Sequence, residues 1–336
     1  MRTSPSAIFD DGAVRMARRV RSRDSGLRQA VEHGLFLVVA GVLRLLPKGA
    51  GAAVGRRTAP LLLRLSRRRR RLLLENLARA FPDARRDEIR RIARRSVENL
   101  GAAFFEFLEV SRWTEADIRA RVAYDGAENL AAARARGRGV ILLSAHFGSW
   151  EVGALAAGLL GEPISSVVRP LDNPRLEAEL TRRRIRFGNR VIAKKEALRE
   201  MLRAMRAKET VAILLDQNVM PEEAVFVPFF GRLAATTPSV ALLQRKTGAA
   251  VVPVFTYRSD GGRWRLRFEP PILPEQFATG DGGRAEHVRL ATARFTEATE
   301  EAIRRQPEAW LWLHDRWKTR PAGESERPVP GRRTTT

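Results

Sequence analysis

Cysteine is absent from the 336 residues of this chain, and histidine is scarce. Without cysteine the protein has no disulfide, no thiolate nucleophile and no zinc site built on cysteine ligands. The four histidines, at positions 33, 146, 287 and 314, are scattered without the spacing of metal ligands. The composition therefore predicts neither a bound metal nor another cofactor.

Lysine is also scarce, but arginine is abundant. Only six of the 61 basic residues are lysine, and with 38 acidic residues the formal net charge is +23. The excess is concentrated in residues 56–95, which contain 15 arginines and four acidic residues, with arginine at every position from 67 to 71. Such a segment attracts anionic lipid head groups, phosphorylated substrates or acidic proteins. Nucleic acid is an alternative partner, but no nucleic-acid-binding motif accompanies the charge, so we expect none.

The chain lacks a long uninterrupted hydrophobic run. Residues 1–25 form a basic, polar N-terminal arm without the apolar core and cleavage site of a secretory signal. Residues 35–46 contain nine consecutive apolar residues before Arg44, fewer than the roughly 20 that span a bilayer. A helix of this kind can lie in the membrane interface beside the arginine cluster, or it can be an ordinary core helix. The composition leaves both alternatives open.

Hydrophobic periodicity divides the remaining chain into a helical region and an α/β core. Apolar residues at helical spacing predict helices at 72–81 and 85–110, separated by Pro82, in a helical region of residues 26–122. Strands that alternate with helices then predict an α/β fold, a mixed sheet flanked by helices, over residues 123–320. The expected strands are 140–144, 164–168, 190–192, 210–215, 225–228 and 250–256, with 264–268 as an edge strand, and the expected helices are 126–136, 150–160, 173–186, 196–206, 238–247 and 284–305. Residues 321–336 are expected to be a disordered tail.

Residues 139–153, GVILLSAHFGSWEVG, carry the main candidate site. Residues 140–143 are continuously apolar, as in a buried strand, and His146 follows the end of that strand. Gly148 permits backbone angles that other residues avoid, Ser149 is a suitable N-cap, and Glu151 lies in the first turn of the next helix. This strand, turn and helix bring the imidazole and the carboxylate of an HxxxxE motif to one corner.

An imidazole beside a carboxylate suits general base catalysis. The reference pKa of histidine, about 6.5, lets His146 accept a proton from a hydroxyl near neutral pH, while the Glu151 carboxylate fixes its tautomer. No serine lies in a GxSxG motif and no cysteine is present, so we expect direct attack of an acceptor hydroxyl and no covalent acyl-enzyme. His314 is not linked by spacing to a carboxylate, so we do not predict it as the base. Alternatively, His146 is a structural residue at the end of a strand.

Two other expected strands end in polar residues. Arg169 follows a buried strand in VVRPLDNP, at a strand end of the kind where α/β proteins bind ligands. Its guanidinium can hold a phosphate or neutralise an oxyanion, or it can form a loop salt bridge. Asp216 and Gln217 end the strand in LLDQN, where they can orient Arg169 or bind an acceptor sugar. We predict a supporting role for both rather than that of the base.

Aromatic residues gather in two segments. Phe226, Phe229 and Phe230 of FVPFFG are candidate walls for an acyl chain, with core packing as the alternative. The segment WLWLHDRWK has three tryptophans within eight residues, beside Arg316 and Lys318. Aromatic and basic residues together suit a membrane interface, and they equally suit packing of the last segment against the core.

A helix start follows the first aromatic segment. Thr237 and Pro238 are expected to be the N-cap and the first residue of the helix at 238–247. Gly231 and Thr236 are candidate backbone contacts to a phosphate at that helix start, because helix N-termini bind anions. This pair adds a predicted phosphate-binding element to the site.

Five segments contain the motifs of a known family. They are SAHFGSWEVG, VVRPLDNP, LLDQN, FVPFFGRLAATTPSVALLQRKTGAAVVPVF and PEAWLWLHDRWKTRP, and the likeness runs from about residue 75 to residue 320. In order and spacing these segments resemble the lysophospholipid acyltransferase superfamily, most closely its lipid A biosynthesis acyltransferases, which add lauroyl or myristoyl groups. The resemblance implies His146 and Glu151 as catalytic residues, an acyl carrier protein thioester as the acyl donor and a hydroxyl of a lipid A precursor as the acceptor. It also implies the cytoplasmic face of a bacterial inner membrane.

Other functions stay open at this point. The chain has GSWE where the family more usually has GNWE, which leaves another glycolipid or a lysophospholipid as an alternative acceptor. A non-catalytic basic protein that binds anionic membrane or nucleic acid would explain the arginines but not the ordered motifs. A metal hydrolase using His146 and Glu151 would need further ligands, which the sequence does not offer.

Overall fold

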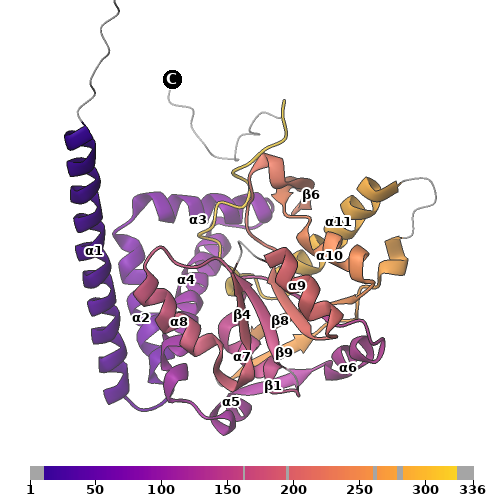
Figure 1. Cartoon of the computed structure of the whole chain (residues 1–336), viewed down its shortest axis with the longest axis horizontal. Coiled ribbons are helices and arrows are strands. Elements are labelled where there is room, and N and C mark those ends of the chain that lie inside the picture. The colour runs from indigo at the N-terminus through magenta and orange to yellow at the C-terminus, as the bar shows by residue number, and fades with distance from the viewer. Residues whose placement is uncertain (1–10, 162, 194–196, 260–262, 278–282, 324–336) are drawn as a thin grey trace, which may run out of the picture.

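The computed structural model describes residues 11–161, 163–193, 197–259, 263–277 and 283–323. Within these ranges, a set of N-terminal helices packs beside an α/β body (Figure 1). Part of the predicted N-terminal arm is helical, since the first helix begins at Asp11. Most of the predicted disordered tail, residues 324–336, and residues 1–10 of the arm lie outside the described residues.

Four helices make up the N-terminal part: α1 (Asp11–Leu45), α2 (Ala50–Arg64), α3 (Arg67–Ala80) and α4 (Arg86–Glu109). The long α1 runs along one side of the molecule and contacts α8 and α4 (Figure 1). The predictions of helices at 72–81 and 85–110 are confirmed by α3 and α4. The sequence did not predict α2, because Pro60 lies in its interior, where proline removes a helical hydrogen bond.

Two glycines set the distance between α2 and α4. A Cβ atom on Gly55 would lie 2.1 Å from the carbonyl oxygen of Gly101, and one on Gly101 would lie 2.3 Å from that of Gly55. A side chain at either position would therefore force the helices apart. Because both residues are glycine, the two helix backbones touch at this point.

One stretch of α1 is long and apolar enough to cross a membrane by length and composition alone. Among the described helices this is Gly26–Leu45, with 20 residues and a mean hydropathy of 1.2, of which 11% is buried. Counting only the uninterrupted apolar residues therefore understated the stretch, because the apolar residues before Leu35 and after Arg44 also contribute. Buried core helices and signal sequences can meet the same criterion, so the finding by itself places nothing in a membrane.

The α/β body is built on a seven-stranded sheet in the order β1-β9-β8-β2-β5-β3-β4. Its strands are β1 (Val122–Asp125), β2 (Val140–Ser144), β3 (Ile164–Val168), β4 (Arg190–Ala193), β5 (Thr210–Leu214), β8 (Ala250–Arg258) and β9 (Trp264–Phe268). Only β8 and β9 pair antiparallel, so the sheet is mixed, as predicted. A separate hairpin joins β6 (Val225–Phe229) to β7 (Arg232–Thr236).

The prediction that residues 264–268 form an edge strand is wrong in position. The strand β9 lies between β8 and β1, and β1 is the edge. The sequence did not predict β1, since this strand has only four residues and buries only Val122 fully. It did not predict β7 either. The six other strands are confirmed with boundaries that agree within two residues.

Helices cover both faces of the sheet. They are α5 (Glu115–Arg121), α6 (Ala127–Ala135), α7 (Trp150–Gly158), α8 (Pro174–Arg184), α9 (Ala197–Arg206), α10 (Ser239–Thr247) and α11 (Gly283–Arg305). In β2, Val140 and Leu142 pack with residues of α6 and α7, whereas Ile141 and Leu143 pack with residues of α9, α10 and α11. Alternate side chains of a strand point to opposite faces, so a strand covered on both faces must be apolar throughout. This explains the unbroken apolar run before His146.

A third hydrophobic cluster joins the N-terminal helices to the C-terminal segment. Leu73 and Leu77 of α3 pack in one cluster with Val97 of α4 and with Phe147 and Trp310. The buried amide of Asn76 on α3 also donates to the carbonyl oxygens of Trp312 and His314, at 2.9 and 2.8 Å. The N-terminal helices therefore pack directly against the turn that carries His146.

Candidate functional site

A tight turn joins β2 to α7 and carries His146. Gly148 in this turn has φ +58°, and a Cβ atom there would lie 1.8 Å from the carbonyl oxygen of Thr256, so only glycine fits. Ser149 is the N-cap residue of α7, as predicted, but its side chain makes no capping hydrogen bond. Because Ser149 is buried, the difference between GSWE and GNWE changes interior packing in the apo protein.

The carboxylate that contacts the His146 ring belongs to Asp216. The Nδ1 atom of His146 lies 2.9 Å from Oδ1 of Asp216, and the backbone N–H of His146 donates to Oδ2 at 3.0 Å. The indole N–H of Trp310 donates to the same Oδ2 atom at 2.8 Å. Strands β2 and β5 are parallel neighbours, so their carboxyl ends bring His146 and Asp216 together. The carboxylate thus holds both the ring and the backbone of His146.

Glu151 does not make the contact that was expected of it. Its carboxylate binds the guanidinium of Arg184, whose Nη2 lies 2.7 Å from Oε1 and whose Nε lies 3.1 Å from each oxygen. The expectation that Glu151 orients the imidazole by direct contact is therefore wrong. The last turn of α8 brings Arg184 over the first turn of α7, and the long arginine side chain reaches the carboxylate first.

The electrostatic surroundings set the protonation of His146 and Asp216. Burial lowers the pKa of His146, but the charge of Asp216, its hydrogen bond and the charge of Glu151 together outweigh burial and raise this pKa above 6.5. Burial raises the pKa of Asp216, yet the charge of His146 and the hydrogen bonds from His146 and Trp310 bring it down to about 2. Asp216 is therefore ionised at neutral pH. Glu151 acts on His146 through its charge, without a hydrogen bond.

The outer nitrogen of the ring faces Gln217. The side-chain nitrogen of Gln217 lies 3.4 Å from Nε2 of His146, on the exposed side of the ring. With Nδ1–H donating to Asp216, the neutral ring presents the Nε2 lone pair in this direction. A hydroxyl that displaces the Gln217 amide would meet a proton acceptor. Asp216 and Gln217 thus act on the two nitrogens of one imidazole.

Residues 309–311 hold the backbone of the His146 turn. The N–H of Gly148 donates to the carbonyl oxygen of Ala309 at 2.8 Å, and the N–H of Leu311 donates to that of His146 at 3.1 Å. Phe147 and Trp310 form an antiparallel bridge between these hydrogen bonds. Sequence patterns did not identify Trp310 as part of the site, because nothing in the WLWL segment indicates which carboxylate its indole would reach.

A profile of the bacterial lipid A biosynthesis acyltransferases matches residues 22–319. The chain belongs to this family. It is 31% identical over 269 residues to the lipid A biosynthesis lauroyltransferase of Escherichia coli (strain K12), which covers 80% of this chain and 85% of that protein. The palmitoleoyltransferase of the same strain is 31% identical over 277 residues, 82% of this chain and 86% of the relative. The myristoyltransferase is 27% identical over 262 residues, 78% of this chain and 79% of the relative. The chain is accordingly an O-acyltransferase of lipid A biosynthesis.

Arg169 of this lipid A acyltransferase lies at the carboxyl end of β3, as predicted, but apart from the buried residues. Its side chain is 79% exposed and forms an ion pair with Asp172, 3.7 Å away. The loop salt bridge that was the alternative is therefore present. The sequence did not reveal that the guanidinium beside Glu151 is that of Arg184, because the two are 33 residues apart and only the packing of α8 brings them together.

The phenylalanines expected as walls of an acyl-chain site are packed in the core. Phe229 is 1% exposed and Phe230 is 6% exposed, and Phe229 contacts the rings of Phe230, Trp310 and Trp317. In this state they are not open to an acyl chain, whereas Phe226 is partly exposed. Of the two alternatives for the tryptophan segment, the structure shows packing against the core, because Trp310, Trp312 and Trp317 are buried.

The predicted phosphate contacts do not form one site. Gly231 is in the turn that begins β7 and Thr236 ends that strand, so the strand separates them. Thr236 is buried, and its hydroxyl accepts from Nη2 of the buried Arg316 at 2.5 Å. The helix α10 begins at Ser239 with Pro238 at its N-cap, one residue later than predicted, and Thr237 accepts from the N–H of Ser239.

His314 is occupied by a structural hydrogen bond. Its Nε2 atom accepts from the backbone N–H of Asn218 at 2.8 Å, and burial lowers its pKa. The ring is thus held neutral and its acceptor nitrogen is engaged. Among the residues that the structure describes, no group of three His, Asp or Glu side chains is arranged to hold a metal.

Proposed function

We propose that this lipid A acyltransferase transfers a fatty acyl group directly from a thioester to an acceptor hydroxyl, with His146 as the general base. The proposal is supported above all by the imidazole whose Nδ1 is held by Asp216 and whose Nε2 faces the exposed side. The Nε2 atom of His146 takes the proton of the acceptor hydroxyl while the hydroxyl oxygen attacks the carbonyl carbon of the thioester. The C–S bond then breaks, and the imidazolium returns the proton to the thiolate. No acyl-enzyme forms in this scheme.

Asp216 is the positioning residue of this scheme. Its ionised carboxylate fixes the tautomer with Nδ1–H and stabilises the imidazolium that forms during attack. Its second oxygen accepts from the backbone of His146 and from Trp310, which removes the freedom of the carboxylate to rotate. Because both donors are made by the fold, the geometry exists before the substrate binds.

Glu151 and Arg184 add charge next to the base. The Glu151 carboxylate favours the protonated form of His146 through space and keeps the half-buried Arg184 guanidinium in place. We propose that this ion pair contributes to catalysis electrostatically. Arg169 is too exposed to act on a buried oxyanion. We propose that it instead binds a phosphate group of the substrate, which would replace Asp172 as its partner.

The proposed donor is an acyl carrier protein thioester, and the proposed acceptor is a hydroxyl of a lipid A precursor. Carrier proteins of this kind are acidic, and the formal net charge of +23 is complementary to such a partner. A lipid A precursor carries phosphate groups, which the arginines also complement. The relatives are named for different acyl groups but all for lipid A biosynthesis, which supports the same class of acceptor.

Transfer from the carrier protein is expected to depend on salt. When the same acyl group is offered on acyl carrier protein and on coenzyme A, the carrier should have the higher kcat/KM, and its KM should rise several-fold from about 50 to about 300 mM salt because charges are screened within about 10 Å. Product formation on a lipid A precursor is measured by mass spectrometry. Equal kcat/KM values without salt dependence would contradict the carrier as donor, and no product from either donor with folded protein would contradict acyl transfer itself.

We also propose that the protein acts at the cytoplasmic face of the bacterial inner membrane. Support comes from α1, where large apolar side chains are exposed along the apolar stretch: Leu27, Val31, Leu35, Leu37, Val38, Val42 and Leu45. Water does not favour such a surface, and monomeric soluble proteins rarely expose a continuous one. The basic α2 and α3 follow directly, which suits an anionic leaflet.

Substitution of exposed α1 residues is expected to release the protein from vesicles. Leu35→Ser with Val38→Ser should lower the fraction that sediments with phosphatidylethanolamine/phosphatidylglycerol vesicles, with a loss of about tenfold in partition, since each side chain contributes on the order of 1 kcal/mol when inserted. Leu198→Ser with Met220→Ser is the control, because these two side chains are similarly exposed on the α/β body. Equal sedimentation of both variants would show that α1 is not the attachment.

A further inference from the structure

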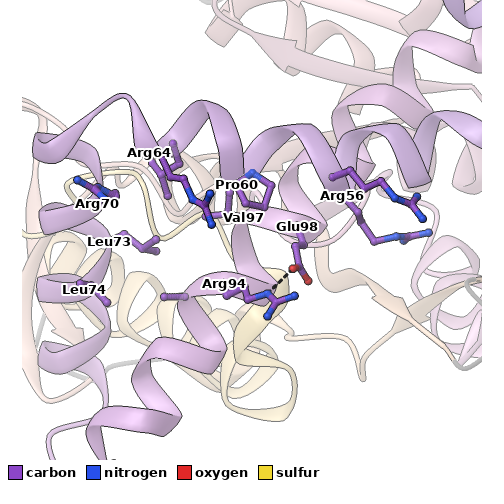
Figure 2. Close-up of a pocket in the computed structure, with 12 residues that line it drawn as sticks. Arg56, Pro60, Arg64, Arg70, Leu73, Leu74, Arg94, Val97 and Glu98 are labelled. Atoms are coloured by element: carbon purple, nitrogen blue, oxygen red, sulfur yellow. Dashed lines mark hydrogen bonds and ion pairs between the residues drawn. The ribbon is translucent and has the colours of Figure 1, made fainter.

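A second site lies between the N-terminal helices. A pocket with a volume of about 580 Å³ opens between α2, α3 and α4, within the size range of small-molecule sites. Leu73, Ala93 and Val97 are buried residues that line it, and arginines from all three helices surround it. Figure 2 shows Arg64 and Arg70 toward one end and Arg56 toward the other. The pocket is therefore apolar at its base and cationic at its rim.

Several of the rim arginines, including Arg64 and Arg70, form no ion pair in the part of the chain that the structure describes. The nearby Arg71, in contrast, pairs with Glu75 at 2.7 Å. On the opposite wall Arg94 pairs with Glu98 at 2.8 Å (Figure 2). Both side chains line the pocket, so an anion bound there would neutralise their charge. Arg64 and Arg70 thus form a cationic rim that lacks its counterion.

Two packed helices carry these two side chains. Arg64 is the last residue of α2, and Arg70 is in the first turn of α3, after a break at Ser66. The Ser66 hydroxyl accepts from the N–H of Arg69 at 3.3 Å and so caps α3 directly beneath them. The glycine contact that holds α2 against α4 sets the other wall. The rim and base are therefore parts of three packed helices rather than of a loop.

The surroundings of the opening are apolar. Leu61, Leu62 and Leu65 of the same helix end are exposed, and so is Leu74, which lines the pocket. An inorganic anion would use the arginines alone and would leave the apolar base without a partner. A lipid with a phosphate group matches both parts, because the phosphate pairs with guanidinium groups and an acyl chain covers leucine and valine.

We propose that the pocket between α2, α3 and α4 binds one lipid that bears a phosphate group, with the phosphate at Arg64 and Arg70 and an acyl chain on Leu73 and Val97. The pocket is separate from His146, but the helix α4 touches both regions. Ser96 and Asn99, beside Val97, donate to the carbonyl oxygens of Trp310 and Glu308 at 3.1 and 3.0 Å. Binding does not require acyl transfer, so it is testable without turnover.

Binding of dioleoyl phosphatidic acid to the full chain, in an uncharged detergent, tests this site by native mass spectrometry. Arg64→Ala with Arg70→Ala is expected to weaken binding about tenfold or more, because two charge-assisted contacts are lost. Arg67→Ala with Arg68→Ala is the matched control, since it removes the same charge from the same arginine run without altering the lining. The control is expected to change affinity less than about twofold. All four arginines are exposed, so the variants should fold.

Several results would overturn the proposal. Equal losses in the two double variants would mean general attraction of charge, and no loss in either would leave the arginines without a role. If inorganic phosphate competed for the pocket as strongly as phosphatidic acid, the apolar base of the pocket would not contribute to binding. If Arg64→Ala with Arg70→Ala lowered the affinity for acyl carrier protein but not that for phosphatidic acid, the pocket would be a binding surface for the carrier protein.

The source of the lipid is decided by a second measurement on the same variants. If the occupant is the acceptor, Arg64→Ala with Arg70→Ala should raise the KM for the lipid A precursor together with the loss of phosphatidic acid binding. If the occupant is a membrane phospholipid, phosphatidic acid binding should be lost while that KM stays as in the control variant. Both results support a phosphate-bearing lipid at this site, and His146→Ala should bind phosphatidic acid as the unmodified protein does.

Discussion

His146→Ala is expected to lower the single-turnover rate of acyl transfer by about 100- to 10,000-fold, as loss of a general base does. The ring is only partly buried, and its removal leaves Asp216 with the Trp310 indole and the His146 backbone N–H as donors. The fold and lipid binding should therefore persist. The rate is measured with acyl carrier protein thioester and excess enzyme, so that product release does not conceal the chemical step.

His314→Ala provides the comparison for this prediction. His314 is also partly buried near Asp216, but its Nε2 atom accepts from the Asn218 backbone. We expect its substitution to reduce the rate much less than that of His146. A folded His146→Ala protein with a rate within about twofold of the unmodified enzyme would remove His146 from the mechanism.

Asp216→Asn is expected to have an effect of similar size and to change the pH dependence as well. The carboxamide has the same shape but no charge, so it neither stabilises the imidazolium nor favours the tautomer with Nδ1–H. The corresponding change in a serine protease costs on the order of 10,000-fold, which sets the scale. A base works only when neutral, and Asp216 raises the pKa of His146. We therefore expect the acidic limb of the kcat/KM profile above pH 6.5 in the unmodified enzyme, and at lower pH in Asp216→Asn.

Glu151→Gln is the control that distinguishes the effect of the Glu151 carboxylate on His146 from that of Asp216. Glu151 acts on His146 by charge without contact, so its removal should move the acidic limb in the same direction but by less. The rate should fall further than this shift accounts for, because Arg184 loses its bidentate partner and keeps only Glu177, 3.9 Å away. A larger shift in Glu151→Gln than in Asp216→Asn would return the role of the orienting carboxylate to Glu151.

The sequence by itself determined six of the seven strands of the sheet and the position of His146, the proposed base. A strand that is covered on both faces cannot alternate polar and apolar residues, so the run before His146 was readable from the chain alone. The turn at Gly148 was also readable, because glycine permits the left-handed backbone angle that the turn requires, φ +58°. These features depend on local geometry, which neighbouring residues specify.

Only the tertiary structure decided which groups meet at the site. Asp216 is 70 residues from His146 and Trp310 is 94 residues from Asp216, and strand order together with the return of the C-terminal segment brings them into contact. Glu151 is nearer in sequence, but α8 places a guanidinium on it. The spacing of an HxxxxE motif determines the backbone positions of the two side chains, whereas tertiary packing determines which residue each side chain contacts. Tertiary packing also explains why Phe229 and Phe230, predicted to line an acyl-chain site, lie in the core. Their rings contact tryptophans from the far end of the chain.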